Sequence, residues 1–271
     1  MKPIERPFDK AILKPEEAAR KFDLKLYAPS AELAGWIEHY WTLTWDLRGD
    51  APFSQKVLSY PSINLTLENE NGASHAEVYG VPRGTFTRTL TGYGECFSAK
   101  FRPGGFYPFW RESASRLTGR KLPLEEIFGA SGEALAGLLS AVPASEARLA
   151  AMERWLLGFA PERDGSAELA GRIVQDAASD RSLLHVEAMA SRHGMSVRTL
   201  QRLLGRYIGV SPKWILQRFR LQEAAERIRQ EKLQDWAGLS MELGYYDQAH
   251  FTRDFKAVVG VPPETYVRGL G

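Results

Sequence analysis

The stretch from Val186 to Pro263 contains one pattern twice, and this repeat constrains the fold more than any other feature of the chain. When Gly209 is placed on Gly260, the two copies come into register at an offset of 51 residues. The matched pairs are Ser196 with Asp247, Leu200 with Phe251, Arg202 with Arg253, and Leu204 with Phe255. Capping, apolar and arginine positions therefore coincide, which indicates two copies of one supersecondary unit.

The first copy is predicted to be a helix-turn-helix. Val186, Met189 and Ala190 have the spacing of the apolar face of a helix. Gly194 can end that helix because glycine tolerates a positive φ, and Ser196 is a natural N-cap for the next helix. The expected buried side of that second helix consists of Val197, Leu200, Leu203, Leu204 and Tyr207. Its opposite stripe carries Arg198, Gln201 and Arg202.

The second copy has the same organisation. Trp236, Leu239 and Leu243 predict its first helix, which ends at Gly244, and Asp247 caps the next one. The expected buried residues of that next helix are Phe251, Phe255 and either Val258 or Val259. The residues left toward solvent are Gln248, His250, Thr252 and Arg253.

The polar stripes of both copies suit DNA. In the major groove, arginine can bind guanine with two hydrogen bonds and glutamine can bind adenine in the same way. The alternative is an ordinary solvated helix face, but two copies in register favour DNA. Between the copies, Ser211 and Pro212 begin a long helical run to Arg229. That helix would act as a rigid spacer, rising about 1.5 Å per residue.

Residues 168–271 resemble the DNA-binding domain of the AraC/XylS transcriptional regulators. The resemblance rests on Arg198–Arg202, Gly209–Lys213, Arg220 with Ala224 and Ala225, Glu242–Lys256 and Gly260–Tyr266. It implies a sequence-specific regulator of transcription whose two recognition helices enter adjacent major grooves. By this resemblance the base-reading residues are Arg198, Gln201, Arg202, Gln248, His250 and Arg253. The residues expected to contact the DNA backbone are Ser196, Thr199, Arg206, Lys213, Thr252 and Lys256.

The same resemblance implies partners and excludes some classes. Double-stranded DNA is the expected partner, with RNA polymerase as a second, and a small-molecule effector and a homodimer are further expectations. No enzyme activity, cofactor or metal is expected. The single cysteine, Cys96, excludes an internal disulfide and the four-cysteine zinc site of the alkyl-transfer DNA repair proteins that carry a similar DNA-binding domain. The effector and the target genes are left open.

Charge and hydropathy fit this interpretation. From Leu183 to Gly271 there are 13 Lys and Arg against 9 Asp and Glu, whereas the preceding residues carry 22 against 24. The basic excess thus coincides with the proposed DNA contacts. The start of the chain has no apolar core typical of a signal peptide, and no apolar run approaches the ~18 residues that span a membrane. We therefore expect a cytoplasmic protein.

The preceding part of the chain alternates in the manner of strands. The predicted strands are Asp23–Tyr27, Trp41–Asp46, Lys56–Tyr60, Ile63–Glu68, Ala76–Gly80, Thr85–Leu90 and Cys96–Arg102. The predicted helices are Pro29–Tyr40, Ala134–Ala141 and Glu146–Phe159. We expect an α+β N-terminal domain, built as a small antiparallel β-barrel or sandwich with helices, followed by an all-α double helix-turn-helix domain. The expected boundaries are 1–160 for a sensor or dimerisation domain, 161–167 for a linker and 168–271 for the DNA-binding domain.

The front domain resembles, more weakly, the cupin-like domain found on one branch of these regulators. The resemblance rests on Gly35–Trp41, Tyr60–Leu65 and Phe101–Phe106. It implies a domain that senses an effector, promotes dimerisation, or does both.

The second hypothesis is an enzyme or a ligand-trapping protein that its C-terminal module addresses to DNA. A metal-binding cupin needs clustered histidines, but none of the five histidines is paired as His-x-His, and His39 is better explained as a core residue. Cys96 is either a redox sensor or, as we favour, a buried small hydrophobe. Arg102–Gly105 could bind an anion, but a strand-to-helix turn is favoured. Either a pocket or the domain core could contain the aromatic residues Trp36, Tyr40, Trp41, Trp45, Tyr60 and Trp110.

Overall fold

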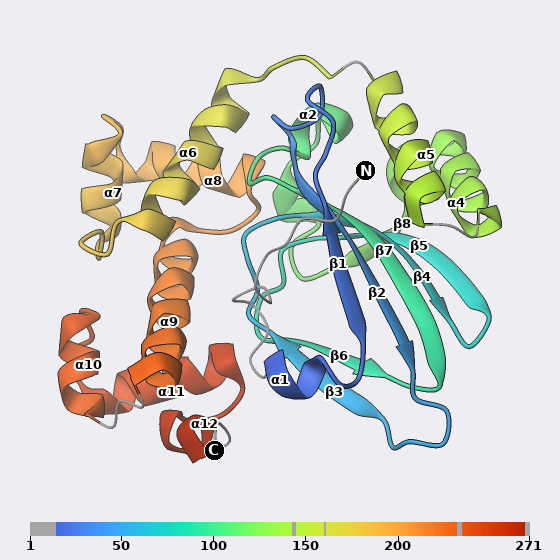
Figure 1. Ribbon diagram of the computed structural model, residues 1–271. Coiled ribbons are helices and arrows are strands. Elements are labelled where there is room, and N and C mark those ends of the chain that lie inside the picture. The colour runs from blue at the N-terminus through green and yellow to red at the C-terminus, as the bar shows by residue number, and fades with distance from the viewer. Residues whose placement is uncertain (1–14, 143–144, 160, 232–234, 269–271) are drawn as a thin grey trace.

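The computed structural model describes residues 15–142, 145–159, 161–231 and 235–268 (Figure 1). The first half is built mainly of antiparallel strands and the second half of helices. The strands are β1 (Asp23–Tyr27), β2 (Ile37–Asp46), β3 (Phe53–Val57), β4 (Asn64–Glu70), β5 (Ala73–Tyr79), β6 (Phe86–Leu90), β7 (Tyr93–Phe101) and β8 (Lys121–Pro123). The helices of this part are α1 (Pro15–Ala18), α2 (Tyr107–Trp110), the 3-10 helix η1 (Ala114–Arg116), α3 (Leu124–Phe128), α4 (Ala130–Ala141) and α5 (Ser145–Gly158).

Six strands form one sheet in the order β1-β2-β7-β4-β5-β8. The period-two pattern of β4 and β7 places apolar residues on one face, where Leu65 lies opposite Ala99 and Leu67 opposite Phe97. This face packs against α3, α4 and α5 to form the main core. On the other face the hydroxyls of Thr66 and Ser98 hydrogen-bond at 2.8 Å.

The sheets do not close into a barrel, which corrects the first of the two β architectures expected from the sequence. Strands β3 and β6 pair with each other as a separate two-stranded sheet. The segments that connect them to the large sheet leave it and pack on the C-terminal helices. Leu58 joins the apolar cluster around the second helix-turn-helix and Val81 the cluster around the first. The segments that would have to close a barrel therefore pack on the C-terminal helices instead.

The prediction of a helix over Pro29–Tyr40 is wrong. One helical turn follows Ser30, whose carbonyl accepts hydrogen bonds from the amides of Leu33 and Ala34, and β2 begins at Ile37. The apolar spacing over this segment fits a helix, but β2 pairs along its length with β7 and from Tyr40 to Thr44 with β1. Sheet pairing at long range in the sequence outweighs the local pattern.

The C-terminal helices form two groups joined by one long helix (Figure 1). The elements are α6 (Gly165–Ser179), α7 (Val186–Arg192), α8 (Val197–Tyr207), α9 (Pro212–Glu231), α10 (Trp236–Glu242), α11 (Gln248–Val259) and α12 (Pro263–Arg268). The first apolar cluster joins α6, α7, α8 and the start of α9, and the second joins the rest of α9 to α10, α11 and α12. Helix α6 begins inside the stretch 161–167, which the sequence predicts as a linker. Across the described residues, no helix is both long and apolar enough to cross a membrane.

Candidate nucleic-acid interface

Helices α7 and α8 form the first helix-turn-helix where the sequence predicts it. The Ser196 hydroxyl caps α8 by accepting a hydrogen bond of 3.1 Å from the amide of Thr199. Leu200 and Leu204 are fully buried beneath the helix. The exposed stripe consists of Arg198, Gln201 and Arg202. The structure thus places these three side chains where a nucleic acid could reach them, and their contact with bases remains a prediction.

Helices α10 and α11 form the second helix-turn-helix. The Asp247 carboxylate caps α11 by accepting a hydrogen bond of 2.7 Å from the amide of His250. Phe251 and Phe255 are fully buried. The exposed polar side chains are Gln248, at the first position of the helix, and His250 and Arg253, which share one face at a spacing of three residues. Each copy of the repeat therefore has a capped helix with an apolar inner side and an exposed polar stripe.

The two stripes differ in charge because α11 carries an acidic residue, Asp254. Its carboxylate lies 3.3 Å from Nε2 of His250 and 3.8 Å from Nε of Arg253. It also accepts a hydrogen bond of 2.5 Å from the side-chain amide of Gln217. Helix α8 contains no acidic residue, so it is the more basic of the two recognition helices.

The residues expected at the DNA backbone occupy different environments. The hydroxyls of Ser196 and Thr199 lie 2.9 Å apart at the N-terminus of α8. Lys213 and Lys256 are exposed, and Thr252 is half-buried. Contact between these residues and phosphate remains a prediction.

Arg206, the sixth residue of that group, contacts the N-terminal domain. Its Nε donates a hydrogen bond of 3.1 Å to the Tyr107 hydroxyl, and Nη2 donates to the same oxygen. Its guanidinium lies over the Tyr107 ring, 5.3 Å from the centroid, and the rings of Tyr107 and Tyr207 are 4.4 Å apart. The C-terminal end of α8 therefore contacts α2 through a hydrogen bond and through ring packing.

The N-terminal domain contacts both copies of the repeat at the same position. Gly209 and Gly260 are the glycines that bring the copies into register, and both adopt a positive φ, 97° and 90°. The Thr118 hydroxyl donates a hydrogen bond of 2.6 Å to the Gly209 carbonyl. Nζ of Lys56 lies 3.4 Å from the Gly260 carbonyl and donates to it. Near the second turn, the Thr85 hydroxyl donates to the carbonyl of the penultimate residue of α11 at 2.8 Å.

The spacer helix α9 lies against the N-terminal domain. Arg218 is 2% exposed, and its guanidinium lies over the Trp214 ring, 4.5 Å from the centroid. It donates a hydrogen bond of 3.4 Å to the Gly84 carbonyl, and its Nε and Nη1 have no partner among the described residues. Burial lowers the pKa of Arg218 to about 10. One turn further, the amide of Gln222 donates to the Ser59 carbonyl at 3.0 Å.

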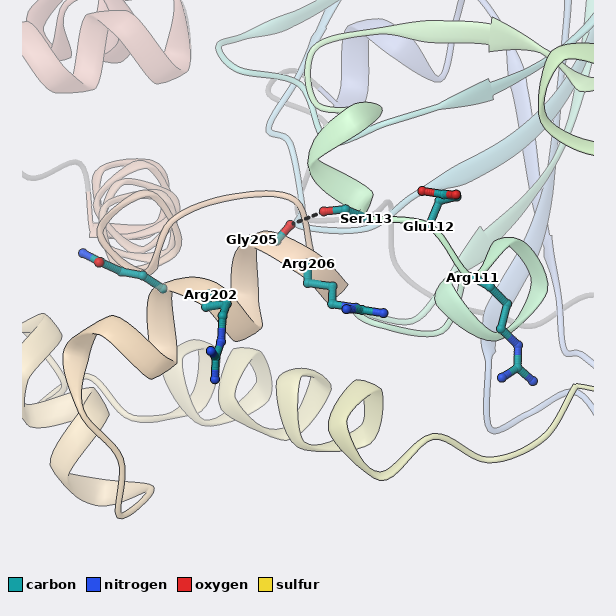
Figure 2. A pocket seen from close by; sticks show the side chains of 7 residues that line it. Arg111, Glu112, Ser113, Arg202, Gly205 and Arg206 are labelled. Atoms are coloured by element: carbon teal, nitrogen blue, oxygen red, sulfur yellow. Dashed lines mark hydrogen bonds between the residues drawn. The ribbon is translucent and has the colours of Figure 1, made fainter.

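A hollow of about 440 Å³ lies between α8 and the N-terminal domain (Figure 2). Its lining consists of Arg111, Glu112, Ser113, Gln201, Arg202, Gly205 and Arg206. The Ser113 hydroxyl reaches the Gly205 carbonyl at 3.5 Å, so one edge of the hollow is a contact between the domains. In Figure 2 the Arg111 and Arg202 side chains extend toward the same side, whereas Glu112 points away from it.

The segment Arg102–Gly105 forms a strand-to-helix turn between β7 and α2, the alternative that the sequence analysis favours over an anion site. Nε of Arg102 donates a hydrogen bond of 2.8 Å to the Ala34 carbonyl, which anchors the turn. A Cβ at Gly104 would lie 2.5 Å from the Ala167 carbonyl oxygen in α6. The turn thus serves close packing between the two parts of the chain.

The polar residues inside the N-terminal domain form an ion-pair cluster. The carboxylate of buried Glu68 lies 3.0 Å from Nη2 of Arg88 and 3.3 Å from Nε2 of His75, and it accepts a hydrogen bond from the Tyr79 hydroxyl at 3.1 Å. Among the described residues, no group of three or more His, Cys, Asp or Glu side chains could hold a metal ion. His39 is buried on β2, in keeping with a core residue.

Several of the N-terminal aromatic residues belong to apolar clusters. Tyr40 is fully buried and Trp45 is 5% exposed, and both lie in clusters of the β domain. Tyr60 instead packs on Phe219 of α9, with the ring centroids 5.6 Å apart. Cys96 is buried in the same cluster as Trp45, and burial raises the pKa of its thiol. These contacts favour core and interface roles over a ligand pocket.

Sequence reasoning missed three residues at this interface. Tyr107 and Arg111 come from the N-terminal domain, and nothing local in the sequence indicates that they lie beside α8. Tyr246 is 94% exposed directly before the cap of α11.

Comparisons with known proteins match the two parts of the chain separately. Residues 189–269 match the family model described as a helix-turn-helix domain, which is of the AraC type. Residues 25–123 match the model described as a domain of unknown function (DUF6597). The C-terminal match confirms the resemblance drawn from the sequence.

Similar individual proteins are found at low coverage or low identity. An uncharacterized HTH-type transcriptional regulator of Haemophilus influenzae is 34% identical over 86 residues, which span 32% of this chain and 28% of that protein. The chain thus covers less than a third of this curated relative. A solved structure of ToxT from Vibrio cholerae covers 92% of this chain and 98% of its own, with 10% identity and a TM-score of 0.39. A structure of ToxT with an unsaturated fatty acid bound covers 91% and 95%, with 9% identity and a TM-score of 0.39.

Proposed function

We propose that this chain is a sequence-specific, DNA-binding regulator of transcription of the AraC/XylS type. One observation carries the proposal: α8 and α11 are capped, buried on their inner sides and exposed on polar sides where Arg202 and Arg253 occupy matched positions. Each stripe fits a major groove, where these side chains distinguish bases. The match of residues 189–269 to the helix-turn-helix model supports the same function.

The N-terminal domain modulates this activity by contacting both recognition units. Thr118 binds the turn after α8 and Lys56 the turn after α11, so a shift of the N-terminal domain changes the support of both helices. An effector acts, in this proposal, by favouring one arrangement of the two domains over another. It can move the equilibrium only as far as its affinities for the two arrangements differ.

Further partners follow from this function. A regulator of transcription acts together with RNA polymerase, and we place the chain in the cytoplasm with the DNA. A homodimer and a small-molecule effector belong to the same proposal. Sedimentation of the full chain with and without DNA tests the dimer.

The test of the proposed function is selection of bound sequences from random double-stranded DNA by the full chain. A shared motif with two sub-sites should emerge. The Arg202→Ala variant should lose its preference in one sub-site and keep the other. Recovery of unrelated sequences by the unaltered chain would contradict the proposed function.

A further inference from the structure

The hollow beside α8 unites residues that are far apart in the sequence. Gln201 and Arg202 belong to the exposed stripe of α8. Arg111 is the residue that ends α2 in the N-terminal domain. The hollow has a volume of about 440 Å³, and its contact edge is closed by Ser113 on Gly205 (Figure 2). A surface of the N-terminal domain is thus placed next to the stripe that faces DNA.

The charge of this hollow is positive. Arg111, Arg202 and Arg206 line it, and the acidic side chain among the lining residues, Glu112, pairs with Arg116 at 2.9 Å. The ion pair of Arg111 is with Glu162, at 3.9 Å, with side chains 58% and 86% exposed. Such an exposed pair is weak, so the Arg111 guanidinium can exchange this partner for a stronger anion.

The backbone of Arg111 adds an independent observation. Arg111 adopts φ 62° and ψ 13° at the end of α2, a left-handed conformation in which glycine is the usual residue. A long side chain at this position is disfavoured by the backbone, and it points to a use for the side chain. The bidentate guanidinium is the side chain best suited to a phosphate.

The geometry of a bound duplex identifies the anion. A recognition helix reads bases with its N-terminal residues, and a helix about 10–12 Å wide nearly fills a major groove about 12 Å wide. The sugar-phosphate backbone therefore passes close along the sides of α8. Arg111 lines the hollow beside this helix together with Arg202 and Arg206, so it lies on a side of α8 along which that backbone passes.

We propose that Arg111 of the N-terminal domain binds a backbone phosphate of DNA next to the sub-site read by α8. The N-terminal domain is then part of the DNA interface, and its docking on α8 adds affinity without adding sequence preference. This inference rests on the proposed function for the position of the DNA.

The experiment measures DNA affinity of the full chain over a series of salt concentrations, by fluorescence anisotropy on the selected site and on a scrambled duplex. Arg111→Gln and Arg111→Gly remove the charge, and the glycine variant also suits the backbone, so it keeps the fold. Both should reduce the slope of log affinity against log salt by about 0.9, the loss of one phosphate contact. Both should weaken binding by the same factor on the two duplexes.

The matched control is Arg48→Gln. Arg48 is an exposed arginine that pairs with Asp46, and the turn between β2 and β3 that contains it lies away from α8 (Figure 1). The Arg48→Gln substitution removes the same charge as the Arg111 substitutions, and it should leave the slope of log affinity against log salt unchanged. An equal change in the control and the Arg111 variants would reduce the effect to net charge and overturn the proposal.

A second series locates the contact. Each duplex in this series carries one uncharged methylphosphonate, placed at successive positions beside the α8 sub-site. At one position the methylphosphonate should weaken binding of the unaltered chain. At that position it should cause no further loss of affinity in Arg111→Gly. A slope unchanged by both Arg111 variants, while Arg202→Ala loses its sub-site, overturns the inference and leaves the proposed function intact. Saturable binding of inorganic phosphate that Arg111→Gly abolishes without a change in the DNA slope would also overturn it, because the hollow would then serve a free anion.

Discussion

The Thr118 hydroxyl lies 2.6 Å from the carbonyl oxygen of Gly209 and donates a hydrogen bond to it. Thr118 belongs to the N-terminal domain, and Gly209 is the left-handed residue that ends the first recognition unit. A Cβ at Gly209 would lie 2.7 Å from the same hydroxyl oxygen. Both the positive φ and the close approach therefore require glycine here, and the contact is specific to this arrangement of the two domains.

Thr118→Val should weaken the contact between the domains. It removes the hydroxyl with little change in shape and leaves the Gly209 carbonyl without this donor, at a cost of about 1 kcal/mol. The melting temperature should fall by about 2–4 °C, and amide exchange should become faster around the turn that ends α8. Thr89→Val is the control, because the Thr89 hydroxyl bonds to Ser54 within the two-stranded sheet. Equal exchange at this turn in both variants would contradict the proposed contact.

Arg218→Met should stabilise the folded chain. Arg218 is buried with one long hydrogen bond, to the exposed Gly84 carbonyl, and methionine can fill the space on Trp214 without a charge. Replacing buried charge with apolar groups is often neutral or stabilising by about 1–4 kcal/mol, so we expect a gain of about 1 kcal/mol. Chemical denaturation checks the gain, and a loss of stability would show that the cation is favourable in this interface.

The gain from Arg218→Met should not depend on pH between about 6 and 9. The folded-state pKa of Arg218 is lowered to about 10 by burial, so the folded chain binds this proton less tightly than the unfolded chain. The resulting penalty is fully present below the folded pKa and is relieved only as the pH rises above about 10. Denaturation curves of both proteins at three pH values test this, and a gain that vanishes at neutral pH would assign it to another group.

Arg202→Ala and Arg253→Ala should weaken binding to the selected site more than binding to random DNA. The two residues occupy matched, exposed positions on α8 and α11. Each lost bidentate contact with a base should reduce affinity by about 1–3 kcal/mol. Arg172→Ala is the control, since Arg172 lies exposed on α6. Equal losses on both kinds of DNA would show that these arginines contact phosphate.

The repeat and the strands were predictable because local patterns determine them. The caps Ser196 and Asp247, and the buried pairs Leu200 with Phe251 and Leu204 with Phe255, lie where the repeat places them. The seven strands expected from the alternation all occur, with ends shifted by a few residues, but β8 has only three residues and no detectable period.

What the sequence could not predict is the contact between the domains. Tyr107, Arg111 and Thr118 meet α8 only because the N-terminal domain docks on it, and no local spacing encodes that docking. Long-range contacts also determine the conformation of the segment before β2. Leu33 and Trp36 have helical spacing, but the chain continues as a strand that is paired on both sides. The open sheets follow from long-range contacts too, since Leu58 and Val81 leave the sheets for the C-terminal clusters.

The central claim is that α8 and α11 read one continuous site, and the spacing of the two sub-sites tests it most directly. Helix α9 joins the two units rigidly, and readers on one face of DNA must sit about 34 Å apart, or about 10–10.5 base pairs. Inserting about five base pairs turns one sub-site to the far side of the duplex. Titration of the full chain on the selected site and on the insertion, at one salt concentration, should show affinity for the insertion falling toward that for random DNA. Undiminished affinity for the insertion would mean that the two helices do not read one site together.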